Sequence, residues 1–231
     1  MPAGFGLVVA IVLLVSANAT SFGDANLTNL MGYLCVWVPL LVAIVVAGAG
    51  VARGGWGSAL DGPGLLRLSI RPIDLVWGLG VGLLSRTVAS LIEILGFGSI
   101  GTAGASFGET VYDGWWLFGA LVAPVLLAPF VEELFFRGLV LRGVYGRVAT
   151  LGAARCAAPI AVGVSGLTFA LMHLVTIDPG STVTVLVVGA STLIFGLAAA
   201  ALALATGRIG GAIVAHVTFN GLVVVPALLG I

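Results

Sequence analysis

The chain has 231 residues, of which 60% are hydrophobic and 8% are charged, and its formal net charge is zero. A soluble domain carries about 25% charged residues, so composition excludes an ordinary water-soluble fold. Zero net charge and the lack of a basic stripe exclude a nucleic-acid-binding protein. The unbroken apolar runs predict an all-α, polytopic transmembrane helical bundle. They do not favour a β-barrel, whose strands alternate polar and apolar residues.

About seven apolar runs, with six to eight as the range, are long enough to cross a hydrocarbon core of about 30 Å as helices. They are 4–19, 30–52, 74–95, 115–141, 156–175, 182–206 and 209–229. The first is interpreted as a membrane helix because no basic residue precedes it, as a secretory signal would require. The fourth is long and is expected to bend at Pro124 and Pro129 or to project past the membrane. Because no loop is large enough to fold alone, we expect one integral membrane domain.

The arginines between the predicted spans all fall on one side of the membrane, and the opposite loops contain acids but no arginine. The arginines are Arg53, Arg67, Arg71, Arg142, Arg147, Arg155 and Arg208, and the acids are Asp24, Glu109, Asp113 and Asp178. The positive-inside rule then predicts a cytoplasmic N-terminus and an external C-terminus. The absence of lysine and the abundance of alanine, glycine and valine indicate a prokaryotic source, so the predicted location is a prokaryotic cytoplasmic membrane.

An acid pair and an arginine lie inside the fourth span, where ionisable groups are costly to bury and therefore the first candidates for chemistry. Glu133 and Arg137 are four residues apart, so on a helix they are predicted to form an ion pair. Glu132 points about 100° away and keeps its oxygens free. This makes Glu132 the better candidate for a general base. The alternative is a cluster of charges at a helix end.

The two histidines also lie in apolar runs, each with a second side chain four residues away. Phe169 shares a helix face with His173, and His216 shares a face with Asn220. An imidazole and a carboxamide on one face can together donate hydrogen bonds to an oxyanion. The alternatives are an interfacial His173 and a polar helix–helix contact at His216 and Asn220, which contributes about 0.6–2 kcal/mol.

Together these groups suit the attack of water on an amide. Glu132 would take a proton from water that His173 helps to hold, while His216 and Asn220 stabilise the oxyanion. No cofactor is required, but a zinc ion held by Glu132, His173 and His216 would satisfy the same residues. The HExxH motif of zincins is absent. The expected partners are the lipid bilayer and a membrane-embedded or membrane-associated peptide, with no nucleic acid.

The motifs EExxxR, FxxxH and HxxxN, in this order on three spans, resemble the CAAX prenyl endopeptidase and bacteriocin-processing family, also called CPBP or Abi. The resemblance covers about 125–225 and includes the FFRG at 135–138. It implies an intramembrane endopeptidase with a CPBP-like core over 111–231, preceded by N-terminal transmembrane helices over 1–110. It also implies that Glu132 and His173 activate water and that His216 and Asn220 form an oxyanion hole. Substrates of the family include prenylated peptides, and its members are often labelled metalloproteases.

Other readings and one difficulty accompany this hypothesis. Intramembrane glutamate and histidine are common in proton relays, so a proton-coupled transporter is the alternative, although no inverted repeat is visible. A noncatalytic scaffold or immunity protein on the same fold is the third.

Arg86 and Glu93 on span three are expected to pair, unless Arg86 approaches Glu133. The difficulty is height: a straight fifth span puts His173 nearer the outer face, whereas Glu132 and His216 lie nearer the cytoplasmic face.

Overall fold

The computed structural model describes residues 2–18, 25–52, 67–100, 113–177 and 181–229, and all regular secondary structure in these ranges is helical. The elements are α1 (Pro2–Asn18), α2 (Ala25–Ala52), α3 (Pro72–Phe97), α4 (Gly114–Leu117), η2 (Phe118–Leu127), α5 (Ala128–Glu133), η3 (Leu134–Val140), α6 (Leu141–Thr150), α7 (Ala154–Thr176), α8 (Thr182–Thr206) and α9 (Gly210–Leu229). The predicted all-α class is confirmed.

The elements α4 to α6 form one helical pass of 37 residues, Gly114–Thr150. Its backbone changes twice to π-helical hydrogen bonding, in η2 and η3. The helix continues past 141, where the span is predicted to end, and reaches Thr150, just before Gly152. Gly152 has a φ of 82°, which is easy only for glycine and turns the chain. Arg142 and Arg147 therefore lie on α6 and not in a loop.

Six helical passes of the described residues are long and apolar enough to cross a membrane, and α1 is a shorter apolar helix. α1 packs against α2, so the described residues hold seven apolar helices, six of them long enough to span, within the predicted range of six to eight. Large apolar side chains face outward, such as Leu95 at 88% exposed and Phe5 at 74%. Such a surface suits lipid and not water. The chain is therefore an integral membrane protein.

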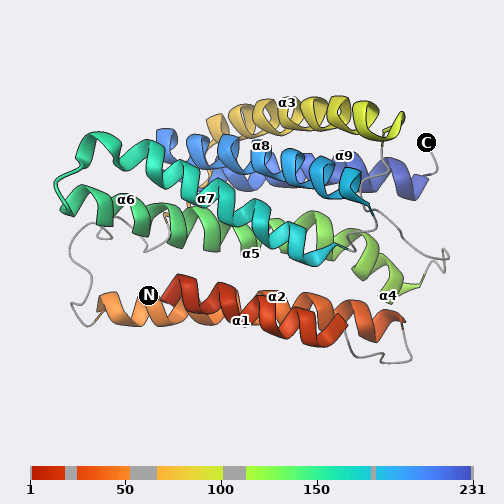
Figure 1. The fold of residues 1–231 in the computed structure, drawn as a ribbon, viewed down its shortest axis with the longest axis horizontal. Coiled ribbons are helices and arrows are strands. Elements are labelled where there is room, and N and C mark those ends of the chain that lie inside the picture. Colours follow the sequence, from red (N-terminus) through yellow and green to blue (C-terminus); the bar gives the residue numbers. More distant parts are fainter. Residues whose placement is uncertain (1, 19–24, 53–66, 101–112, 178–180, 230–231) are drawn as a thin grey trace.

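The passes form three layers (Figure 1). α1 and α2 make one layer, the pass from α4 to α6 lies with α7 in the middle, and α3, α8 and α9 make the third. The start of α3, the α6–α7 turn and the α8–α9 turn lie at one end of the bundle, and the chain termini lie at opposite ends. The described loop arginines therefore share one end. Arg53, Asp24, Glu109 and Asp178 lie outside the described residues, and the orientation in the membrane stays a prediction.

Glycines allow the site-bearing helices to approach closely. On α3, a Cβ at Gly78 would lie 2.7 Å from the Gly211 carbonyl oxygen, and one at Gly82 would lie 2.7 Å from that of Ala215. Small residues spaced four apart bring membrane helices into backbone contact in this way. Helix α3 thus fixes the position of α9, which carries both His216 and Asn220.

Candidate active site

The α6–α7 turn brings Glu132 and His173 to the same level in the bundle. Glu132 lies 20 residues before Gly152, and His173 lies 21 residues after it. Two helices that run antiparallel from a tight turn hold residues equidistant from it at equal height. The predicted difference in height is therefore wrong. It followed from ending the fourth span at 141, about two and a half turns before the helix ends.

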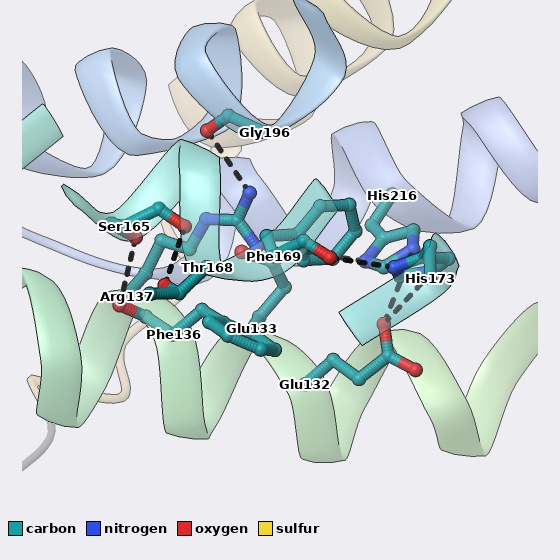
Figure 2. Close-up of polar contacts among 10 residues, drawn as sticks. All are labelled: Glu132, Glu133, Phe136, Arg137, Ser165, Thr168, Phe169, His173, Gly196 and His216. Carbon is teal, nitrogen blue, oxygen red and sulfur yellow. Dashed lines mark hydrogen bonds and ion pairs between the residues drawn. The ribbon is translucent and has the colours of Figure 1, made fainter. Parts of the chain in front are cut away.

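Glu132, His173 and His216 meet at one point between three helices (Figure 2). The Oε2 atom of Glu132 is 3.8 Å from His173 Nε2 and 3.9 Å from His216 Nε2. These separations exceed a direct hydrogen bond, and one water molecule can bond to both atoms across such a gap. Glu132 Oε2 is also buried and has no hydrogen-bond partner. An orphaned buried oxygen of this kind is costly unless a polar molecule binds to it.

Each imidazole is held through its Nδ1 atom. His173 Nδ1 lies 2.9 Å from the Phe169 carbonyl oxygen, and His216 Nδ1 lies 2.9 Å from Glu133 Oε1. Both oxygens only accept, so both Nδ1 atoms are assigned the hydrogen. In the neutral ring the Nε2 atom then carries a lone pair. Both histidines therefore present an acceptor towards Glu132, unless they bind a second proton.

The predicted pair of Glu133 and Arg137 is confirmed. Arg137 Nη1 donates to Glu133 Oε1 over 2.7 Å, and both side chains are fully buried. Arg137 Nη2 also donates to the Gly196 carbonyl oxygen over 3.1 Å, which ties this pass to α8. Since Glu133 also accepts from His216, one carboxylate joins three helices through Arg137 and His216. Glu133 and Arg137 hold the site in place, and Glu132 is left facing the histidines.

Phe169 occupies the centre of an aromatic shell round these groups. Its ring centroid lies 4.3 Å from that of His173 and 5.4 Å from that of His216. The guanidinium of Arg137 lies 4.5 Å from the same ring, within the range of a cation–π contact. The ring centroid of Phe195 lies 4.7 Å from that of His216. No motif in the sequence indicated Phe195 or Gly196, because α8 carries no ionisable residue.

Asn220 is held by the backbone of the fourth pass: its Nδ2 donates to the Pro124 carbonyl oxygen over 2.8 Å. The backbone explains this bond. The Ala128 N–H donates to the carbonyl oxygen of Ala123, five residues back. With the same spacing, the donor to the Pro124 carbonyl oxygen would be residue 129, but Pro129 has no N–H. Asn220 thus supplies the donor that Pro129 lacks. One N–H of its amide remains for another acceptor.

Residues 114–222 match the model of the family described as type II CAAX prenyl endopeptidase Rce1-like. This part of the chain is similar to the Rce1-like family. Comparison with curated proteins gave no match, and neither did comparison with solved structures. This similarity supports a CAAX protease embedded in the membrane. The matched residues contain Glu132, His173, His216 and Asn220, so the family segment includes the whole predicted site.

As its atoms are placed, the site does not match the ligand spacing of a tetrahedral zinc ion. Two ligand atoms of a tetrahedral zinc with bonds of about 2.0–2.1 Å lie about 3.3 Å apart. The two pairs at Glu132 Oε2 are 3.8 and 3.9 Å apart. Among the described residues, no group of three His, Cys, Asp or Glu side chains is arranged to hold a metal ion. No catalytic step is therefore assigned to a metal.

Arg86 and Glu93 form the predicted ion pair on α3. Arg86 does not reach Glu133, whose Oε1 is engaged by Arg137 and His216. The Arg86 guanidinium lies 5.3 Å from the ring of Phe219, on the α9 turn between His216 and Asn220. This pair lies outside the matched residues 114–222, and its arginine contacts α9 through the ring of Phe219.

Proposed function

We propose that the chain is an intramembrane endopeptidase that hydrolyses a peptide bond of a membrane-associated peptide. The observation that carries this proposal is the buried, unpartnered Oε2 of Glu132, which faces the Nε2 atoms of two histidines at 3.8 and 3.9 Å. Similarity to a CAAX protease family supports the same reaction class. The peptide carries a lipid if the substrate follows the family's description.

Glu132 acts as the general base in this proposal. Its carboxylate takes a proton from a water molecule that also donates a hydrogen bond to the lone pair of His173 Nε2. The hydroxide attacks the peptide carbonyl and forms a tetrahedral oxyanion. Protonated Glu132 then gives its proton to the leaving nitrogen, the C–N bond breaks, and the new carboxyl and amine are released. Glu132 takes up one proton and releases one proton in each cycle, so no further acid is needed.

His216 and Asn220 stabilise the oxyanion. Because His216 Nδ1 donates to Glu133, its Nε2 can donate to an oxyanion only when the ring is an imidazolium. The hydrogen bond to Glu133 fixes the orientation of this ring. Asn220 contributes the amide N–H that Pro124 does not use. Donors fixed in advance by such partners are the usual source of oxyanion stabilisation.

The enzyme works in a prokaryotic cytoplasmic membrane with its N-terminus inside and its C-terminus outside. The clustering of the described loop arginines at one end of the bundle supports this orientation. Substrates reach the site from the lipid or from its surface, because the site is buried among membrane helices.

The decisive test is Glu132→Gln, which keeps the shape of the side chain and removes the base. We expect cleavage to fall at least about 10²-fold, measured by the loss of cleaved membrane peptides in cells that express the variant and by assay of the purified protein on a peptide found in this way. His173→Gln should lower activity as well. Arg155→Gln is the matched control, because Arg155 is exposed at one end of the bundle.

Thermal unfolding of the purified proteins, all in one detergent, checks that each variant is folded. A folded Glu132→Gln protein that cleaves at the wild-type rate would remove Glu132 from the mechanism. Proton-coupled uptake by reconstituted wild-type protein, without peptidase activity, would replace the proposal with the transporter hypothesis.

A further inference from the structure

Several arginines gather round the α8–α9 turn, at the end of the bundle away from the C-terminus. Arg142 Nη2 donates to the Gly207 carbonyl oxygen over 3.1 Å. The Arg67 carbonyl oxygen accepts from Ile209 N over 3.4 Å, and Arg67 Nη1 lies 3.4 Å from where a Cβ on Gly207 would be. Both guanidinium groups therefore meet at Gly207, at the end of helices that cross the membrane.

The acid described at this end is already neutralised. Arg208 donates to both oxygens of Asp74, with Nε at 3.0 Å from Oδ2 and Nη2 at 2.6 Å from Oδ1. Asp74 Oδ2 also accepts from the Arg71 backbone N–H over 2.8 Å. These bonds raise the pKa of Arg208 above its usual value. Asp74 is therefore a fixed partner of Arg208 and does not balance the other arginines.

Arg67 and Arg142 are left without a countercharge within the described ranges, where the ion pairs involve other residues. The two like charges lie close enough to interact. The Nε of Arg142 is buried and has no hydrogen-bond partner. A buried donor without a partner is unfavourable, and so are two neighbouring cations without a countercharge. A bound anion would relieve both costs.

We propose that Arg67 and Arg142 bind the phosphate of an anionic membrane lipid. Guanidinium groups match phosphate oxygens through paired N–H donors. Anionic lipid phosphates lie at the membrane surface, which is where these helices end. The source is inferred from the side chains next to Arg67: Leu68, Ile70 and Ile73 are 48%, 58% and 48% exposed. These apolar side chains would lie against acyl chains, which free phosphate does not have.

The test uses purified full-length protein in nanodiscs of phosphatidylcholine with increasing phosphatidylglycerol, and native mass spectrometry to count bound phosphatidylglycerol. We expect each of Arg67→Gln and Arg142→Gln to lower its affinity about fivefold, and the double variant about 30-fold. Arg142→Lys, which keeps the charge but loses the paired donors, should lower the affinity by less than Arg142→Gln does. Arg155→Gln, at an exposed arginine outside the cluster, should change affinity less than twofold.

The proposal is overturned if the double variant binds phosphatidylglycerol like the wild type, or if Arg155→Gln weakens binding as much as Arg67→Gln. Inorganic phosphate is the second arm: if it displaces phosphatidylglycerol at equal concentration, the lipid assignment is wrong. A third test changes Asp61, a residue outside the described ranges. Asp61→Asn should leave lipid affinity equal or higher, and a loss of affinity would contradict the site. Thermal unfolding in pure phosphatidylcholine nanodiscs shows whether each variant is folded.

Discussion

The hydrogen bond from Asn220 to Pro124 allows a structural role to be separated from a catalytic one. We consider Asn220→Leu, a substitution of similar shape that removes the donor. It leaves the Pro124 carbonyl oxygen without a partner, because Ala128 donates to Ala123 and Pro129 has no N–H. A lost hydrogen bond between membrane helices costs about 0.6–2 kcal/mol, and an orphaned carbonyl about 1–3 kcal/mol. We expect a loss of about 1–2 kcal/mol in this half-buried position.

Pro129→Ala supplies the missing N–H and so provides the second arm of a double-mutant cycle. In this background the Pro124 carbonyl has a backbone donor, and Asn220→Leu should cost less than about 0.5 kcal/mol. The measurement is the free energy of unfolding in mixed detergent micelles. Thr218→Val is the control on α9, because the Thr218 hydroxyl bonds only within its own helix, to Val214 at 2.8 Å.

Activity should respond differently from stability in the same four proteins. If the second N–H of Asn220 serves the oxyanion, Asn220→Leu lowers kcat about 10²–10³-fold with or without Pro129→Ala. An equal stability loss in both backgrounds would refute the role given to Pro129. Recovery of activity together with stability in the double variant would refute the oxyanion role of Asn220.

Three further predictions follow from the same geometry. Arg137→Met should destabilise the protein by about 3–5 kcal/mol, since it leaves Glu133 buried without its cation; chemical unfolding would show this. Gly82→Ala should cost about 1–3 kcal/mol through collision with the α9 backbone, whereas Gly80→Ala, with open space round its Cβ position, should be neutral; the two are compared by thermal unfolding. A chelator should leave peptidase activity unchanged, and a loss restored by zinc would instead make Glu132 a metal ligand.

Spacing along a single helix was enough to predict some of the site. Glu133 and Arg137 pair because residues four apart share a helix face, and the same rule placed Phe169 beside His173. These contacts depend on local geometry alone. The membrane class and the number of passes followed from the lengths of the apolar runs.

Contacts between helices could not be predicted in this way. The height of His173 relative to Glu132 depended on where α6 ends, and apolar periodicity defines such ends poorly. The partner of Asn220 depended on a π-helical shift, which is a hydrogen-bonding choice of the backbone and has no sequence pattern here. Gly196 entered the site because its carbonyl meets Arg137, and a backbone carbonyl carries no signal in the sequence.

The pairing of Glu133 with Arg137 inside one helix has a consequence for biogenesis. Because synthesis runs from the N-terminus, this helix meets the translocon before Gly196 and His216 exist. An unpaired charge costs about 2.5–3.5 kcal/mol on insertion scales, and a partner one turn away reduces that cost at once. The nascent segment thus enters lipid with Arg137 already paired. Because His216 and Asn220 arrive only with α9, the proposed active site is complete only after the last described helix has entered the bilayer.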